Sequence, residues 1–241
     1  MTIKKISNLC KFAVIPLLLG FPLAVIAYRI QLWNMGTSFQ LIKFTAYASV
    51  AVLAIALIVG IIGFFKKQKD VVKTCTSVAI LLAIPVVGLS MTGAKAKSLP
   101  FIHQVSTDTV NLPKFEKVIE LRGDNSNPLA YDREKLEPLQ QEAYPELQPI
   151  MSELNTEQAF SKAVDTAIKL GWEVVAKDAI KGTIEAVDTT LLWAFKDDVA
   201  IRILATDTGS KIDLRSVSRI GGSDLGANAE RIKTFISLFS E

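Results

Sequence analysis

The sequence predicts an α+β protein in which three N-terminal transmembrane helices precede a two-layer domain, with two helices packed on an antiparallel sheet of about four strands. Long apolar stretches nearly free of charge in residues 1–92 predict the membrane domain. Helical and strand periodicities in residues 155–241 predict the exported α+β domain. Between them, the Pro-rich residues 93–154 predict an extended arm that wraps the compact domain.

The spans are predicted from length and charge. Residues 44–65 contain no charged residue, and a helix of that length covers a hydrocarbon core of roughly 30 Å. Shorter apolar runs at 12–28 and 74–91 predict two further spans. The first run also permits a second interpretation, a cleaved signal peptide, because lysines precede it and it ends in the small-residue stretch AVIA. A retained anchor is the simpler interpretation, since a long apolar hairpin follows.

Charge placement predicts the orientation. Lysines flank the first run and fill the loop at 66–73, so the positive-inside rule places the N-terminus in the cytoplasm and everything after Met91 outside. Through Thr92 the chain holds nine basic residues and one acidic residue, whereas the remainder holds eighteen basic and twenty-three acidic ones. The net charge of +3 is thus a topological signal and not a nucleic-acid footprint. We expect a multi-pass protein of the inner (plasma) membrane whose C-terminal domain is periplasmic or otherwise extracytoplasmic, with the lipid bilayer as its first partner.

The sequence favours neither a cofactor nor a metal site. Both cysteines, Cys10 and Cys75, lie at membrane boundaries, so the exported domain has no thiol for a disulfide, a nucleophile or a zinc site. His103 is the single histidine.

Regular elements begin at Asn155. Asn155 or Thr156 caps a predicted helix that Gly171 ends, and Ser223 caps a last helix. A short helix is predicted in the arm at 133–142. The predicted strands span residues 172–176, 183–187 with 191–195 as a continuation or an extra strand, 199–205 and 211–219, with turns at 181–182, 196–198 and 207–210.

Several separated blocks of this sequence resemble one known family. They are IHQVSTDT at 102–109, AYPELQP at 143–149, GWEVV at 171–175, IEAVDTT at 184–190, FKDDVAIRI at 195–203 and DLRSVSRIGGSDLGANAERI at 213–232. In this order they resemble the domain of unknown function 1499 family over about residues 99–240. The resemblance implies a domain boundary after the membrane part and supplies no activity.

The last predicted strand carries the main candidate site. Residues two apart share one face of a strand, so Asp213, Arg215 and Arg219 point the same way, and Arg202 and Glu185 can join them from neighbouring strands. One interpretation is a cross-strand ladder of ion pairs, which stabilises sheets. The other is a fork of guanidinium groups that binds a carboxylate or a phosphate.

Four residues are secondary candidates. His103 could pair with Asp108 in the nearby STDT stretch, or make a structural hydrogen bond. Asp224 complements the N-terminus of the last helix better than a bound anion would, and Asn228 is a candidate to tie down the arm. The adjacent acids at 197–198 are interpreted as turn residues and not as a metal pair.

Three functional hypotheses follow. The leading one is a non-enzymatic, membrane-anchored module whose exported domain binds an envelope protein, a lipid component or an anionic ligand through Arg202, Arg215 and Arg219. The alternative is an envelope hydrolase or transferase that uses His103 with Asp108 or an acidic pair. In a third hypothesis the transmembrane helices themselves carry the function. The scarcity of ionisable residues inside them argues against it, because such residues usually mark ion or substrate paths.

Overall fold

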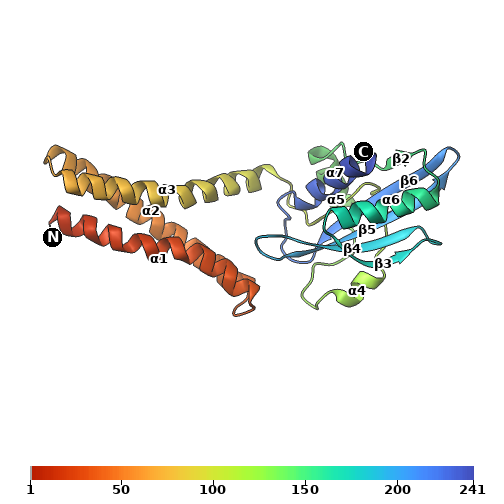
Figure 1. Cartoon of the computed structure of the whole chain (residues 1–241), viewed down its shortest axis with the longest axis horizontal. Helices are drawn as coiled ribbons and strands as arrows, with labels where there is room; N and C mark the ends of the chain where they lie inside the picture. Colours follow the sequence, from red (N-terminus) through yellow and green to blue (C-terminus); the bar gives the residue numbers. More distant parts are fainter. Residues whose placement is uncertain (1) are drawn as a thin grey trace. The chain divides into compact units, whose positions relative to one another are not determined.

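The computed structural model describes residues 2–241 and divides the chain into two compact units (Figure 1). The first unit ends at Ala96 and the second begins at Lys97. The first holds long apolar helices and the second holds an antiparallel sheet with helices, so the predicted α+β class is confirmed.

The N-terminal unit consists of α1 (Ile3–Arg29), α2 (Met35–Phe65) and α3 (Lys69–Ser98). Within residues 2–241 these three helices are long and apolar enough to cross a membrane. Close packing depends on small residues where the helices meet: a Cβ at Gly20 would lie only 2.6 Å from Oγ1 of Thr45. Large apolar side chains such as Phe12 and Phe65 point outward, as expected of surfaces that meet lipid.

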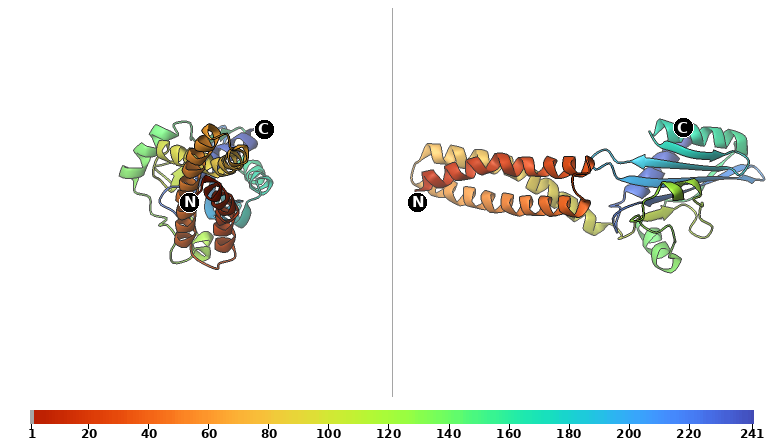
Figure 2. Two further views of the ribbon diagram at one scale, coloured as in Figure 1. Left: turned by 90° about the vertical axis from the view of Figure 1, so that its left-hand side faces the viewer. Right: turned by 90° about the horizontal axis from the view of Figure 1, so that it is seen from below.

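The C-terminal unit is built on one antiparallel sheet with helices packed against it (Figure 2). The strand order is β1-β6-β5-β4-β3, and β2 also pairs with β6. The strands of residues 97–241 are β1 (Gln104–Ser106), β2 (Ile150–Ser152), β3 (Glu173–Asp178), β4 (Thr183–Thr189), β5 (Lys196–Thr206) and β6 (Gly209–Ser218). The four strands predicted from the compact domain are present. Two more come from the Pro-rich arm, because β1 and β2 both pair with β6, so the arm is part of the sheet and not only a cover.

Helices cover both faces of this sheet. The apolar core lies on the face under α6 (Thr156–Lys169) and α7 (Ala227–Ser240), where Trp172 stacks on Phe235 with ring centroids 5.6 Å apart. Asn155 caps α6 through a reciprocal capping box with Gln158, which confirms the predicted start. The arm supplies the predicted helix α5 (Arg133–Ala143) and a short helix α4 (Lys117–Leu121), which lies on the opposite side of the sheet from α6 and α7 (Figure 1).

Three local predictions are wrong. Residues 191–195 form a loop and not a strand, because Ala194 adopts φ = 55°, which extended backbone excludes. Residues 196–198 begin β5 and do not form a turn, since buried arginines face both aspartates there. Ser223 does not cap the last helix, which begins at Ala227 with Gly226 as N-cap in the left-handed conformation.

Candidate functional site

The strand register sorts the charged residues onto two faces of the sheet. Directly opposed residues of antiparallel strands share a face, so the pairs Arg202↔Asp213 and Ala200↔Arg215 put these side chains on one side. Glu185 lies on the same side through its pairing with Ala200. We call this the arm face, because α4 and its flanking arm segments cover it. The predicted alternation of the strand from Ile212 is confirmed.

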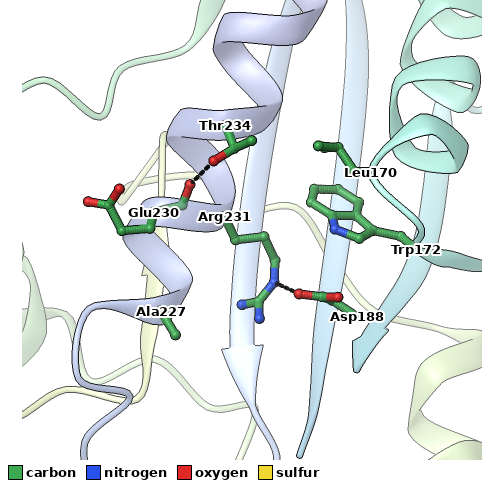
Figure 3. Close-up of a pocket in the computed structure, with 7 residues that line it drawn as sticks. All are labelled: Leu170, Trp172, Asp188, Ala227, Glu230, Arg231 and Thr234. Atoms are coloured by element: carbon green, nitrogen blue, oxygen red, sulfur yellow. Dashed lines mark hydrogen bonds and ion pairs between the residues drawn. The ribbon is translucent and has the colours of Figure 1, made fainter. Parts of the chain in front are cut away.

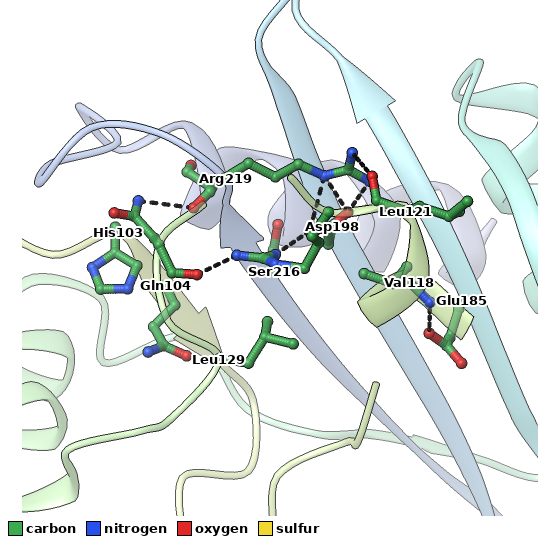
Figure 4. Close-up of polar contacts among 12 residues, drawn as sticks. His103, Gln104, Val118, Leu121, Leu129, Glu185, Asp198, Ser216 and Arg219 are labelled. Carbon is green, nitrogen blue, oxygen red and sulfur yellow. Dashed lines mark hydrogen bonds and ion pairs between the residues drawn. The ribbon is translucent and has the colours of Figure 1, made fainter. Parts of the chain in front are cut away.

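Arg219 and Arg122 share the buried carboxylate of Asp198 on the arm face. Figure 4 shows Arg219 beside Asp198 and Leu121. Nε and Nη2 of Arg219 donate to Oδ1 of Asp198 over 3.0 and 2.7 Å, and Nη1 donates to the carbonyl of Leu121 over 2.8 Å. Arg122, at the end of α4, donates to Oδ2 of Asp198. Burial lowers the pKa of Arg122, and the nearby Asp198 opposes this shift. The acid thus binds the arm to the sheet.

Arg215 is held without a carboxylate among its contacts. Its guanidinium donates to Oε1 of Gln104 over 2.7 Å and to the carbonyl of Leu129, and it lies 5.2 Å from the ring centre of Phe115. Burial lowers its pKa to about 10. The surrounding groups come from β1 and the arm, so Arg215 is enclosed by the chain itself.

Glu185 does not join the arginines. Its Oε1 accepts from the backbone amides of Glu116 and Lys117 over 3.0 and 2.9 Å, and its Oε2 accepts from the amide of Val118 over 2.9 Å. These amides would otherwise be unsatisfied at the start of α4. Glu185 therefore fixes α4 on the sheet.

Arg202 belongs to a more accessible group at the edge of the arm face. It donates to Asp213 over 2.7 Å and to Asp108 over 3.3 Å, and Lys211 donates to Asp108 over 3.1 Å. Burial opposes ionisation of Asp108, but hydrogen bonds from the amides of residues 110 and 111 and from Lys211 outweigh it, so its pKa is lowered. The cross-strand ion pair between Arg202 and Asp213 is the kind that the ladder interpretation predicts.

His103 and Asp108 are not brought together. The carbonyl of His103 accepts from the amide of Ser218, near the end of β6, whereas Asp108 shares Arg202 with Asp213. Asp213 and Ser218 are five strand residues apart, which is roughly 16 Å. Burial lowers the pKa of His103, which disfavours the imidazolium form. Its carbonyl accepts from Nδ2 of Asn228 over 3.0 Å, so Asn228 does tie the arm to α7. Asp224 accepts from the amides of Gly226 and Asn228 over 2.9 and 3.0 Å, which supports its capping role.

A second network, not predicted from the sequence, lies on the face of the sheet that α6 and α7 cover, which we call the helix face (Figure 3). Arg231 of α7 donates from Nε to Asp188 over 2.7 Å and from Nη2 to Asp197 over 2.5 Å. Its Nη1 donates to Ser216 and to Asn228. Asp188 and Asp197 are directly opposed on β4 and β5, where two like charges repel unless a cation lies between them. Arg231 is that cation.

This network forms one wall of a pocket of about 260 Å³. The pocket is lined by Leu170, Trp172, Asp188, Ala227, Glu230, Arg231 and Thr234. The side chain of Arg231 is buried, with 5% exposed, whereas 27% of the Asp188 side chain remains exposed. The sequence signal for this site is the spacing of Asn228 and Arg231, three apart on α7 beside its apolar stripe.

A protein-family comparison identifies the C-terminal unit. Residues 104–239 match the family described as "Protein of unknown function (DUF1499)". The chain belongs to this family. The DUF1499 region begins at β1 and ends within α7, so it includes the arm from residue 104 onward, both charge networks and the pocket, while α1, α2 and α3 precede it. No curated protein matches the chain. Among residues 2–241, no three His, Cys, Asp or Glu side chains are grouped so that they could hold a metal ion.

Proposed function

We propose that this protein is a membrane-anchored binding module whose DUF1499 domain recognises an envelope component bearing a cationic group, such as an ammonium. The observation that carries the proposal is the pocket beside Arg231, where the Asp188 carboxylate is held rigidly and still faces solvent. A side chain fixed by packing and hydrogen bonds makes a preorganised contact for a ligand.

The charges in this pocket favour a cation over an anion. Each guanidinium nitrogen of Arg231 already donates to a group of the chain, so an anion would have to displace Asp188, Asp197 or Asn228. The pocket lining carries two negative charges, those of Asp188 and Glu230, and one positive charge, that of Arg231. Trp172 adds an aromatic wall, which also attracts cations.

The arginines of the arm face remain a second proposed contact, for an anionic ligand or an envelope protein. Arg215 and Arg219 are buried beneath the arm, so a ligand could reach them only if the arm moved. Arg202 at the edge is more accessible, but Asp213 and Asp108 already neutralise it. The geometry therefore favours the pocket. It gives no support to hydrolysis by His103 with Asp108, because those residues lie at opposite ends of β1.

We further propose that the protein resides in the inner (plasma) membrane, with its N-terminus in the cytoplasm and the DUF1499 domain outside. The lysines of the N-terminus and of residues 66–73 support this orientation. Protease added to intact spheroplasts should digest the domain. Digestion only after the membrane is opened would contradict the orientation.

The binding proposal is tested by native mass spectrometry on the full chain extracted from membranes. A component retained by the wild type should be lost in Asp188→Asn, which removes the charge and keeps the size of the side chain. The matched control is Asp207→Asn, in the exposed turn between β5 and β6. Thermal unfolding of both variants separates lost binding from lost folding. Equal retention of the component by a folded Asp188→Asn protein would refute the proposal.

A further inference from the structure

The pocket beside Arg231 also restricts which cation it can bind. Its walls come from the segment that follows α6, from the end of β4 and from the first turns of α7, which contribute Trp172, Asp188 and Glu230 respectively. Its volume of about 260 Å³ is below the roughly 300–1,000 Å³ of pockets that hold drug-sized ligands. The pocket therefore suits one small polar group of a larger molecule.

Asp188 presents a hydrogen-bond acceptor to this pocket. Nε of Arg231 donates to its Oδ2 over 2.7 Å, and within residues 2–241 no group donates to its Oδ1. The side chain is 27% exposed, so this second oxygen can accept from a ligand. An ammonium that keeps its N–H groups can donate to Oδ1, whereas a quaternary ammonium has no hydrogen to donate.

Trp172 presents a hydrogen-bond donor to the same pocket. Figure 3 shows its indole nitrogen on the side of the ring that faces Asp188. Among residues 2–241 no group accepts from this N–H, and the nitrogen is not fully enclosed by the chain. Because a tryptophan N–H at a buried position usually has a partner, this N–H is a ready donor for a ligand oxygen.

The aromatic surface of the pocket is too small to enclose a quaternary ammonium. One face of Trp172 is stacked on Phe235, with ring centroids 5.6 Å apart, and the residue is only 6% exposed. Sites that recognise quaternary ammonium ligands surround them with an aromatic cage. Trp172 is the one aromatic residue in the lining, so selectivity here depends on hydrogen bonds.

We propose, in an inference that rests on the cation-binding function above, that the pocket recognises a primary ammonium with an oxygen on the neighbouring carbon. The ammonium donates to Oδ1 of Asp188, and Glu230 adds negative charge to the same lining. The oxygen accepts from the indole N–H of Trp172. Because both protein groups line one small pocket, the two ligand atoms that meet them must also lie close together. Amino sugars and the ethanolamine headgroup of lipids share this chemistry.

NMR on the full chain, isotope-labelled at the indole nitrogens of its three tryptophans, tests this inference. The protein is held in maltoside micelles, which contain no amine. Trp172→Phe identifies the Trp172 signal, and Trp33→Phe with Trp193→Phe identifies it by elimination should that variant not fold. We expect ethanolamine and glucosamine to shift this signal and to bind about fivefold more tightly than ethylammonium, which lacks the oxygen and its hydrogen bond. The signals of Trp33 and Trp193, outside the pocket, are the internal control and should not move.

Two further probes distinguish failure of this inference from failure of the proposed function. Choline carries methyl groups in place of the ammonium hydrogens, so binding as tight as that of ethanolamine would overturn the primary ammonium and leave cation binding intact. Equal affinities of ethylammonium and ethanolamine would overturn the contact with Trp172. Ethylene glycol has the oxygens without the charge, so binding as tight as that of ethanolamine would refute both proposals, as would no response to any amine. Tighter binding of glucosamine than of glycerophosphoethanolamine would identify a glycan as the source, and the reverse order a lipid headgroup.

Discussion

Replacing Asp198 with alanine tests whether the arm-face network holds the domain together. Asp198 is fully buried, and it is the carboxylate that Arg219 and Arg122 share, with side chains only 11% and 7% exposed. Removing one partner of a buried ion pair leaves uncompensated charge and costs about 3–5 kcal/mol. Here two guanidinium groups lose their acid together, so we expect a value at the upper end of that range. A domain of this size loses roughly 2–4 °C of Tm per kcal/mol, so a loss of about 5 kcal/mol should lower the midpoint by roughly 10–20 °C.

Thermal unfolding followed by tryptophan fluorescence measures this effect. Trp172 is buried and stacked on Phe235, so its emission reports the loss of the domain core. The control Asp207→Ala removes an exposed aspartate and should stay within about 0.5 kcal/mol of the wild type. A Tm for Asp198→Ala within about 2 °C of this control would refute the reasoning, because it would show that the arginines need no buried acid.

Three further predictions concern single positions. The pKa of the single histidine, His103, measured by NMR, should lie below its ordinary value of 6.5. The free energy of unfolding should therefore fall as the pH drops below about 6.5, because the unfolded chain takes up the proton first. His103→Gln should lose this part of the pH dependence. In urea unfolding, Gly182→Ala should destabilise the domain more than Gly171→Ala. Both glycines have positive φ, which costs about 1–2 kcal/mol for alanine. At Gly182 the added Cβ would also lie 2.3 Å from the carbonyl oxygen of Ile203, whereas at Gly171 it would meet no atom within 4 Å. Glu185→Ala should release α4 and speed limited proteolysis of residues 114–130, whereas unchanged cleavage would show that the backbone amides do not depend on this carboxylate.

Local patterns explain how much of the fold is predictable. The alternation of the strand from Ile212, the capping residue Asn155 and the helix stop at Gly171 are short-range features, and each is present in the structure. By contrast, β1 and β2 have three residues each and exist only through pairing with β6, more than fifty residues away in the sequence. A pairing over that distance leaves no local periodicity in the sequence, so the sequence predicts an arm that wraps the domain and not two strands of the sheet.

The candidate site divides in the same way. That Arg215 and Arg219 share a face follows from the two-residue period of one strand. The burial of Asp197 and Asp198 beside arginines cannot be predicted in this way, because the local sequence Lys-Asp-Asp favours a turn. Only the register, which opposes Asp188 to Asp197, shows why Arg231 is needed between them.

The two networks differ in what they leave for a ligand. On the arm face, Asp198 is fully buried and Glu185 is covered by α4, so their charges are used to fix the arm on the sheet. On the helix face, Arg231 is equally enclosed, but its partner Asp188 keeps 27% of its side chain exposed on a pocket. Asp188 accepts a hydrogen bond from Arg231 on one side and lines the pocket on the other, so it stabilises the fold and can still contact a cation. For this reason we propose Asp188 as the first ligand contact, ahead of Arg215 and Arg219, which a ligand could reach only if the arm moved.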